Sequence, residues 1–333
     1  EDVLSLQLSA AAAYEAEVGA FAQVQRKKHG ADQRIVQRLT TAGTAKDRIV
    51  ALTLQAQESG FHSLPHVRQL LALAERPAVE VKLAAVDALA ELFLTRLLPD
   101  RALVAFEKQR LPASAACVAT SHGGSDSSKD ANGATARLMG AYLEGELKAV
   151  YARLVAVVEQ GTHDHLSHVK QRMVGRLYGM LTSKPELERR LLSALVNKLG
   201  DPEKKVASRI AHVLGQLTIN HPAMKSVVLA ELQRFVLRPN VSESAQYYAI
   251  VFMNQIILAR REPQLAHTLL LIYLALFSAR VASGAPLGSR MLSSILSGLH
   301  RAIPFCDDEA TRERTGASPS PSPSPSHQAR RRG

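Results

Sequence analysis

Residues 183–217, which read SKPELERRLLSALVNKLGDPEKKVASRIAHVLGQL, decide the fold. This segment holds two stretches in which apolar side chains recur with the period of a helix. Between them stands Gly-Asp-Pro, at positions 200–202, which is typical of a tight turn. The segment therefore predicts two helices joined by a short connection.

The expected start of the first helix is Ser183, because Ser183 and Glu186 have the spacing of a capping box with Pro185 in the first turn. Gly200 is expected to end this helix in the left-handed conformation. The apolar face recurs at every fourth position and comprises Leu187, Leu191, Leu195 and Leu199.

The second helix repeats this pattern, with Asp201 as the expected cap and Pro202 at the first helical position. Its apolar face comprises Val206, Ile210, Val213 and Leu217. Prolines recur about every 37 residues, from 185 to 222 and from 202 to 239, close to the ~40-residue period of two-helix repeats. We therefore expect an all-α, HEAT/armadillo-like α-solenoid of antiparallel helix pairs, with a simple helical bundle as the alternative.

The helical pattern runs from about Thr44 to Ala302 and divides the chain into expected parts. Two stretches do not fit the helical pattern. The small, polar residues centred on 122–128 cannot bury enough apolar surface to order themselves, and the Ser-Pro and Arg tail has a low-complexity composition. The expected parts are an N-terminal extension that is helical or poorly ordered (1–42), first helical repeats (43–113), a disordered loop insert (114–136), further helical repeats (137–305) and a disordered tail (306–333).

The composition supports helices and a polyanionic partner. The 333 residues are 46% hydrophobic and only 5% aromatic, without Trp, which suits helices packed on helices. A formal net charge of +11 favours nucleic acid or an acidic surface. The longest apolar stretch, 269–277, is short of the ~18 residues that a membrane span needs, so no membrane partner is expected. The start at Glu1 without Met suggests a fragment or an incomplete gene model.

The sequence contains few candidates for metal-binding or catalytic motifs. His163, His165 and His168 are the densest group of potential metal ligands, but their spacing does not complete a tetrahedral set, and a solvated helix start is the favoured interpretation. Cys117 and Cys306 lack metal-ligand spacing. No P-loop, nucleophile elbow or zinc-protease motif occurs. We therefore expect no catalytic residue, cofactor, metal or small-molecule substrate.

The candidate binding residues lie on the second predicted helix. Lys205, Arg209 and His212 recur at i, i+4 and i+7, opposite the apolar face, and Lys198 and Lys204 are expected to be exposed beside them. Such a stripe can contact phosphates, and it is also what an ordinary solvated helix face looks like.

Several stretches, in one order, resemble the CCAAT-binding-factor family. They are residues 192–202 with 205–208, 221–225, 238–243, 245–249 and 254–256, and upstream 46–54 with 85–89 and 97–101. The similarity extends from about residue 43 to residue 305. After Phe305, where family members usually carry further repeats, the sequence becomes a Ser-Pro tail, so the module is expected to be truncated.

The resemblance implies a non-enzymatic helical scaffold in nucleolar assembly of the large (60S) ribosomal subunit. Its implied partners are another nucleolar complex protein, the pre-60S particle and pre-ribosomal RNA, in the nucleus and nucleolus. The alternatives are a CCAAT-box DNA-binding transcription regulator, although no DNA-binding signature occurs, and a helical-repeat adaptor for protein cargo.

Overall fold

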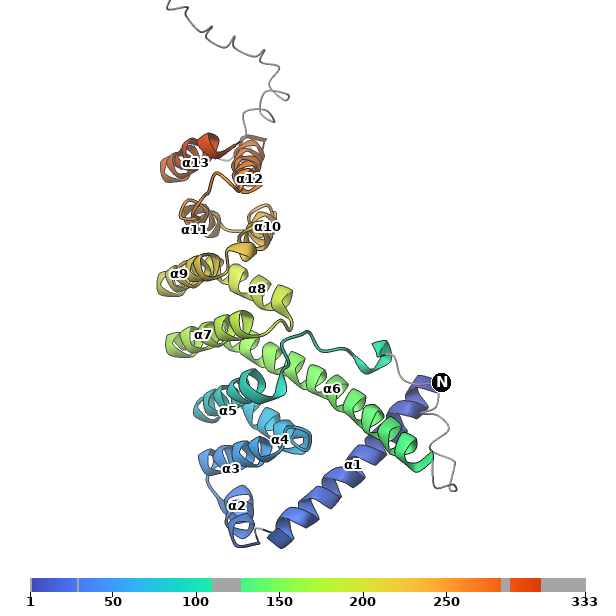
Figure 1. Cartoon of the computed structure of the whole chain (residues 1–333). Coiled ribbons are helices and arrows are strands. Elements are labelled where there is room, and N and C mark those ends of the chain that lie inside the picture. The colour runs from blue at the N-terminus through green and yellow to red at the C-terminus, as the bar shows by residue number, and fades with distance from the viewer. Residues whose placement is uncertain (1, 29, 110–126, 283–287, 307–333) are drawn as a thin grey trace, which may run out of the picture. The chain divides into compact units, whose positions relative to one another are not determined.

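The computed structural model describes residues 2–28, 30–109, 127–282 and 288–306 (Figure 1). Within these ranges every regular element is a helix and no strand occurs, so the chain is all-α as predicted. The chain divides into two compact units, the first formed by residues 1–198 and 203–210 and the second by 199–202 and 211–333. Helix α9 (Lys204–Asn220) contributes residues to both units, which are described separately below.

In the first unit, several helices contact both the next helix and the one after it, and α1 contacts α2 and α6. Thus α3 contacts α4 and α5, α5 contacts α7, and α7 contacts α6 and α8. This is the contact pattern of stacked helix pairs; the solenoid itself stays a prediction. The elements of this unit are α1 (Asp2–Lys28), α2 (Gly30–Ala42), α3 (Ala45–Glu58), α4 (Leu64–Ala74), α5 (Val79–Leu92), a π-helical turn (Phe93–Leu97), a 3₁₀ turn (Phe106–Lys108), α6 (Ser127–Gly161), α7 (Ser167–Ser183) and α8 (Glu188–Asn197).

The second unit shows the same pattern, since α10 contacts α11 and α12, and α13 contacts α11 and α12. Its elements are a 3₁₀ turn (Pro222–Met224), α10 (Lys225–Val236), α11 (Glu243–Met253), α12 (Pro263–Ala282), α13 (Ser289–Ala302) and a last 3₁₀ turn (Ile303–Phe305). A further 3₁₀ turn, Lys198–Gly200, follows α8.

Local sequence explains where several helices begin. A capping box precedes α3: the Thr44 hydroxyl accepts the Asp47 N–H at 3.3 Å, and the Asp47 carboxylate accepts the Thr44 N–H at 3.0 Å. At α11 the Ser242 hydroxyl accepts the N–H of Ala245, so Ser242 caps this helix.

The predicted core positions are buried. In the first unit, the side chains of Leu191, Leu195, Val206 and Ile210 are all 0% exposed. In the second unit, Val213 is 2% exposed. The hydrophobic period therefore located the buried faces of these two helices correctly.

The predicted start of the first of these helices is wrong. Ser183 is the last residue of α7, and α8 begins only at Glu188, after Leu187 has adopted a left-handed backbone with φ 56°. The reason is that the Glu186 carboxylate is buried among distant polar groups, described below, and does not reach back to cap a helix.

The predicted left-handed end at Gly200 is also wrong, because Gly200 closes a 3₁₀ turn without a positive φ. A Cβ at this position would lie 3.2 Å from the Cβ of Ala245, so close packing is what favours glycine there. The next helix, α9, begins at Lys204 and not at Pro202.

The predicted loop insert is shorter than expected at its C-terminal end. Helix α6 begins at Ser127, so 127–136 are helical rather than irregular. Residues 114–126 and 307–333 lie outside the described residues. Within 1–42, the described residues form α1 and α2.

Helix α12 is long and apolar enough to span a membrane by length and composition alone. One third (33%) of its apolar window is buried in the structure, where α12 contacts α10 and α13. Length and composition do not distinguish such a packed helix from a membrane span.

Candidate nucleic-acid interface

The basic residues predicted on α9 are exposed, apart from Lys198. Lys204, Lys205 and Arg209 are exposed on the part of α9 that belongs to the first unit, where Val206 and Ile210 occupy the buried face. His212 is exposed on the part that belongs to the second unit. The helical period thus predicted the exposure of these side chains, and their role in binding stays a prediction.

Lys198 was expected to be exposed and is instead buried, with a relative exposure of 6%. Counting along the helix explains this difference. Lys198 stands seven residues after Leu191 and three after Leu195, so it shares the buried face with them. Lys198 therefore does not belong to the exposed set.

Most arginines on neighbouring helices of the first unit are already held by carboxylates. Both Arg172 and Arg176 pair with Asp87 across α5 and α7. Further pairs join α4 with α6 and α6 with α8, namely Arg68–Glu146 at 2.6 Å, Arg153–Glu75 at 2.7 Å and Arg190–Glu159 at 2.6 Å. The positive charge of these arginines is therefore partly neutralised by carboxylates within the unit.

The three cations at the start of α9 differ from these arginines. Lys204, Lys205 and Arg209 form no recorded ion pair with any residue in the described part of the chain. The nearby carboxylate of Glu203 contacts α7 instead, where Lys170 Nζ lies 3.8 Å from it. Positive charge at the start of α9 is therefore available to an external polyanion.

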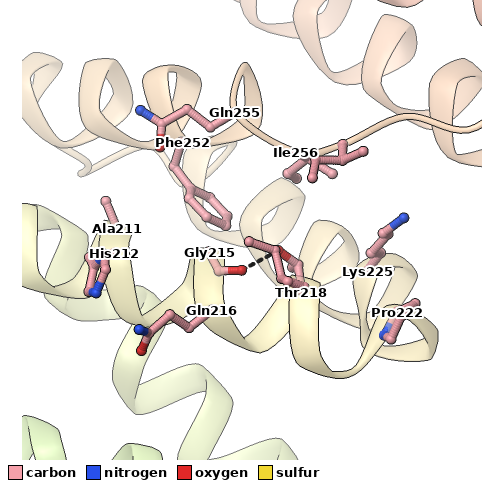
Figure 2. A pocket seen from close by; sticks show the side chains of 12 residues that line it. Ala211, His212, Gly215, Gln216, Thr218, Pro222, Lys225, Phe252, Gln255 and Ile256 are labelled. Atoms are coloured by element: carbon pink, nitrogen blue, oxygen red, sulfur yellow. Dashed lines mark hydrogen bonds between the residues drawn. The ribbon is translucent and has the colours of Figure 1, made fainter.

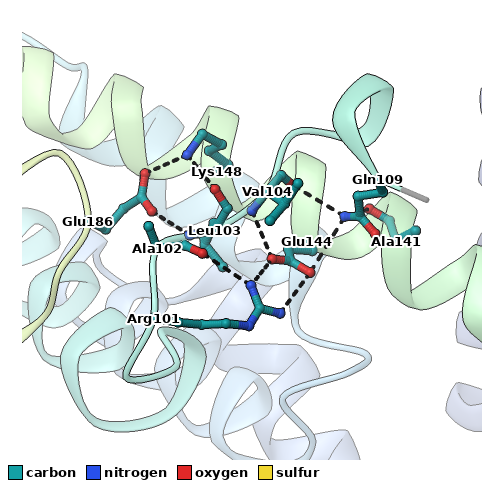
Figure 3. A network of polar contacts seen from close by, with 9 residues as sticks. All are labelled: Arg101, Ala102, Leu103, Val104, Gln109, Ala141, Glu144, Lys148 and Glu186. Carbon is teal, nitrogen blue, oxygen red and sulfur yellow. Dashed lines mark hydrogen bonds and ion pairs between the residues drawn. The ribbon is translucent and has the colours of Figure 1, made fainter.

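A polar network that the sequence did not reveal fixes the segment before α6 (Figure 3). The Glu144 carboxylate on α6 accepts a hydrogen bond from the Val104 N–H at 2.8 Å and binds the Arg101 guanidinium through two hydrogen bonds. The hydrogen bond from Arg101 holds the pKa of Glu144 below its usual value, although partial burial opposes this. The same interaction raises the pKa of Arg101.

Glu186 completes this network from the connection between α7 and α8 (Figure 3). Its carboxylate is 1% exposed and accepts hydrogen bonds from the Leu103 N–H at 2.6 Å and from Lys148 Nζ at 2.8 Å. Lys148 also donates to the Leu103 carbonyl at 2.6 Å. The network orders segment 98–109 and is structural; no local pattern signals it, because its members are 38 to 83 positions apart.

The second unit contains a groove of about 400 Å³ between α9, α10 and the end of α11 (Figure 2). Two of the polar side chains that line it have partners within the unit. The Thr218 hydroxyl donates to the Gly215 carbonyl at 2.9 Å, and Lys225 pairs with Glu262 at 2.9 Å. Phe252 and Ile256 form its apolar floor. No pair of a nucleophile with a hydrogen-bonded base occurs among the described residues that line this groove.

The histidines near the start of α7 show no ligand geometry. The His163 Nδ1 lies 3.1 Å from the Glu159 carbonyl, and the Asp164 carboxylate accepts the Leu166 N–H. Across the described ranges, no three His, Cys, Asp or Glu side chains gather closely enough to hold a metal ion.

Three comparisons with known proteins bear on identity. The chain is 35% identical over 304 residues to CCAAT/enhancer-binding protein zeta of Mus musculus, covering 90% of this chain and 28% of that protein. It is 34% identical over 324 residues to Ribosome biogenesis protein NOC1 of Chaetomium thermophilum, covering 84% and 30%. It is 31% identical over 287 residues to Nucleolar complex protein 1 of Drosophila melanogaster, covering 83% and 23%.

The chain spans less than a third of the length of each of these relatives. No family model matches it. The similarity covers most of the chain. It therefore includes the stretches of sequence that resemble this family in the same order. Over the aligned segment, the chain therefore belongs to the CCAAT-binding-factor group that includes CCAAT/enhancer-binding protein zeta and the NOC1 nucleolar complex proteins.

Proposed function

We propose that this chain is a non-enzymatic helical scaffold that acts in the nucleolus, in assembly of the large (60S) ribosomal subunit. The observation that carries this proposal is the 34% identity, over 84% of the chain, to a protein named Ribosome biogenesis protein NOC1. A second relative is named Nucleolar complex protein 1, and the names of these relatives indicate no enzyme family. The proposed partners are another nucleolar complex protein and the pre-60S particle.

We further propose contact with pre-ribosomal RNA. Support comes from the net charge of +11 and from the exposed Lys204, Lys205 and Arg209 at the start of α9. RNA phosphates are attracted by clustered cations that are not already paired with carboxylates.

The name of CCAAT/enhancer-binding protein zeta favours a second function, DNA binding. Against it, the sequence has no helix-turn-helix, zinc-finger or basic-zipper signature. A protein-cargo adaptor would fit helical pairs equally well, but it does not explain the names of the other relatives.

Sedimentation of tagged chain from nuclear extracts on a density gradient tests these functions. Ribosome assembly predicts that the chain migrates with particles that contain precursor large-subunit RNA and that RNase treatment shifts it to lighter fractions. Migration with chromatin fragments, sensitive to DNase but not to RNase, would favour the DNA-binding function instead. Migration free of both would contradict both functions.

A further inference from the structure

The first unit contains a cavity lined by polar side chains, away from α9. The proposed scaffold role assigns no ligand to this cavity. It has a volume of about 350 Å³ and lies between α1, α2, α3 and α4. This volume is within the range of small-ligand sites and suits one planar heterocycle with part of its sugar. Four uncharged amides are part of its lining; they are Gln25, Gln37, Gln55 and Gln69.

The imidazole rings of His62 and His66 also line the cavity, and each ring has one nitrogen that forms no hydrogen bond with the described residues. The His62 Nδ1 is 2.8 Å from the Ser59 hydroxyl, which leaves Nε2 directed elsewhere. Neither His62 Nε2 nor His66 Nδ1 has a hydrogen-bond partner among the residues that the structure describes, although both atoms are buried. The Glu17 carboxylate lies 3.8 Å from His62 Nε2, which is within ion-pair distance if the ring is protonated but beyond hydrogen-bond range. Buried polar atoms of this kind are uncommon, because leaving them unpaired costs free energy.

The ionisation of the lining suits a neutral, polar ligand. Burial lowers the pKa of His66, so its ring is neutral at physiological pH and offers one donor and one acceptor nitrogen. Each glutamine amide offers two donor hydrogens and one acceptor oxygen. Glu58 and Arg26 are the charged residues in the lining, and they carry opposite charges. The cavity thus presents the mixture of donors and acceptors that matches the edge of a nucleobase.

An aromatic surface lies beside these groups. The rings of Phe21 and His62 are stacked in parallel, with centroids 4.0 Å apart and an interplanar angle of 2°. Unstacked bases of single-stranded RNA bind proteins by stacking on such rings while their edges are hydrogen-bonded. The α1 helix, on which Phe21 stands, ends in the basic residues Arg26, Lys27 and Lys28, of which Arg26 lines the cavity and all three are exposed.

We infer that this cavity binds one base of single-stranded RNA, with the basic end of α1 contacting the adjoining phosphates. The base edge would be read by Gln55 and His66, and the base plane would lie against the Phe21–His62 pair. This inference rests on the proposed association with RNA and adds to it a second contact, which is independent of α9 and selective for unpaired nucleotides. A free nucleotide has the same chemistry, but it would not use Lys27 and Lys28.

The matched pair Gln55→Leu and Gln57→Leu tests this inference. Both residues lie on α3, but Gln55 lines the cavity and Gln57 is exposed outside it. The measurement is binding of labelled single-stranded and duplex RNA 12-mers, and of the mononucleotides AMP and UMP, across a salt series. We expect tighter binding of single strands and about a tenfold loss for Gln55→Leu, the scale of one lost base contact, with no loss for Gln57→Leu. Because a base contact releases no counterions, Gln55→Leu should leave the salt dependence unchanged.

Further variants and a mapping experiment keep the inference open to refutation. His66→Phe keeps an aromatic side chain and removes both ring nitrogens, including the unpartnered Nδ1, so it should weaken single-strand binding without lowering the thermal stability. Changing Lys27 and Lys28 to Gln should make the affinity for RNA depend less steeply on salt concentration. If the unmodified chain binds mononucleotides more tightly than RNA, the ligand is a free nucleotide. In the unmodified chain, RNA carrying 4-thiouridine should crosslink to peptides from 18–26 or 62–69.

Equal binding of duplex and single strand, equal effects of the two glutamine variants, or crosslinks confined to α9 would each overturn the inference. The proposed function would survive such results if the chain still sedimented with pre-ribosomal particles. Loss of that sedimentation, with cavity-dependent RNA binding retained, would contradict the proposed function alone.

Discussion

At the scale of single residues, Ile210 tests the buried face of α9. Its side chain is 0% exposed, so Ile210→Ala should lower the free energy of unfolding by roughly 2–5 kcal/mol through lost burial and the cavity left behind. The matched control is Ile219→Ala on the same helix, because Ile219 is 62% exposed and should change stability by less than about 0.5 kcal/mol. Denaturant unfolding measures both, and similar effects from the two changes would contradict the assigned register.

A second prediction for a single residue concerns Gly298 on α13. Replacing it with Ala should lower the free energy of unfolding, although the same change at most helical glycines raises it. Glycine inside a helix normally destabilises it by about 1 kcal/mol relative to Ala. A Cβ on Gly298, however, would lie 2.6 Å from Cζ of Tyr273, and the Tyr273 hydroxyl is held by Asn254 at 2.6 Å. Gly298→Ala should therefore destabilise the chain, by about 1–3 kcal/mol.

Gly215 on α9 provides the control for Gly298, in the same unit. A Cβ on Gly215 would meet no atom within 4 Å among the described residues, so Gly215→Ala should stabilise by up to about 1 kcal/mol. Thermal unfolding of both variants checks the opposite signs. A stabilising effect of Gly298→Ala would show that the Tyr273 ring can move aside.

At the scale of elements, mutation of the exposed cations of α9 tests whether the scaffold contacts RNA or binds only proteins. Lys205→Glu with Arg209→Glu should leave helicity unchanged, because both side chains are exposed on the face opposite Ile210. If both contact phosphates, RNA affinity should fall and the slope of its logarithm against log salt should become shallower by roughly 1.4–1.8.

The control for this charge reversal is the double variant Arg76→Glu with Arg96→Glu. These arginines are exposed on other elements and undergo the same change of charge. RNA titrations over a salt series, after circular dichroism has shown equal helicity, distinguish the two. Equal losses from both double variants would indicate only a general effect of net charge, and no loss from either would exclude α9 as an RNA contact.

At the scale of the whole molecule, carboxylates that accept hydrogen bonds predict how stability depends on pH. Hydrogen bonds from Arg101, Lys184 and Thr44 lower the pKa values of Glu144, Asp100 and Asp47, respectively. A carboxyl whose pKa is lower in the folded chain stabilises the fold above its unfolded pKa, near 4, and that contribution is lost as pH falls through the folded value.

The free energy of unfolding should therefore decrease as the pH falls from about 5 to about 3. Arg101→Gln should lower stability at pH 7 and make this decrease shallower, because Glu144 then titrates closer to its ordinary range. Urea unfolding at several pH values measures the difference. Parallel pH profiles for the two proteins would mean that the pair of Arg101 with Glu144 adds no stability.

The sequence by itself determined the helical class, the buried faces of α8 and α9 and the exposure of Lys204, Lys205 and Arg209. These features follow from the period of apolar residues along one helix, which is a local property. The same period also explains the burial of Lys198, which shares a face with Leu191 and Leu195 and was wrongly expected to be exposed.

Only the tertiary structure decided the features that join distant segments. Ser183 and Glu186 have the spacing of a capping box, yet Glu186 binds the Leu103 N–H and Lys148, and α8 begins later. The glutamine- and histidine-lined cavity likewise combines residues of four helices that no short motif links. The physical reason is that a buried polar group takes whichever partner the packing brings within hydrogen-bond distance, and packing depends on contacts between residues far apart in the sequence.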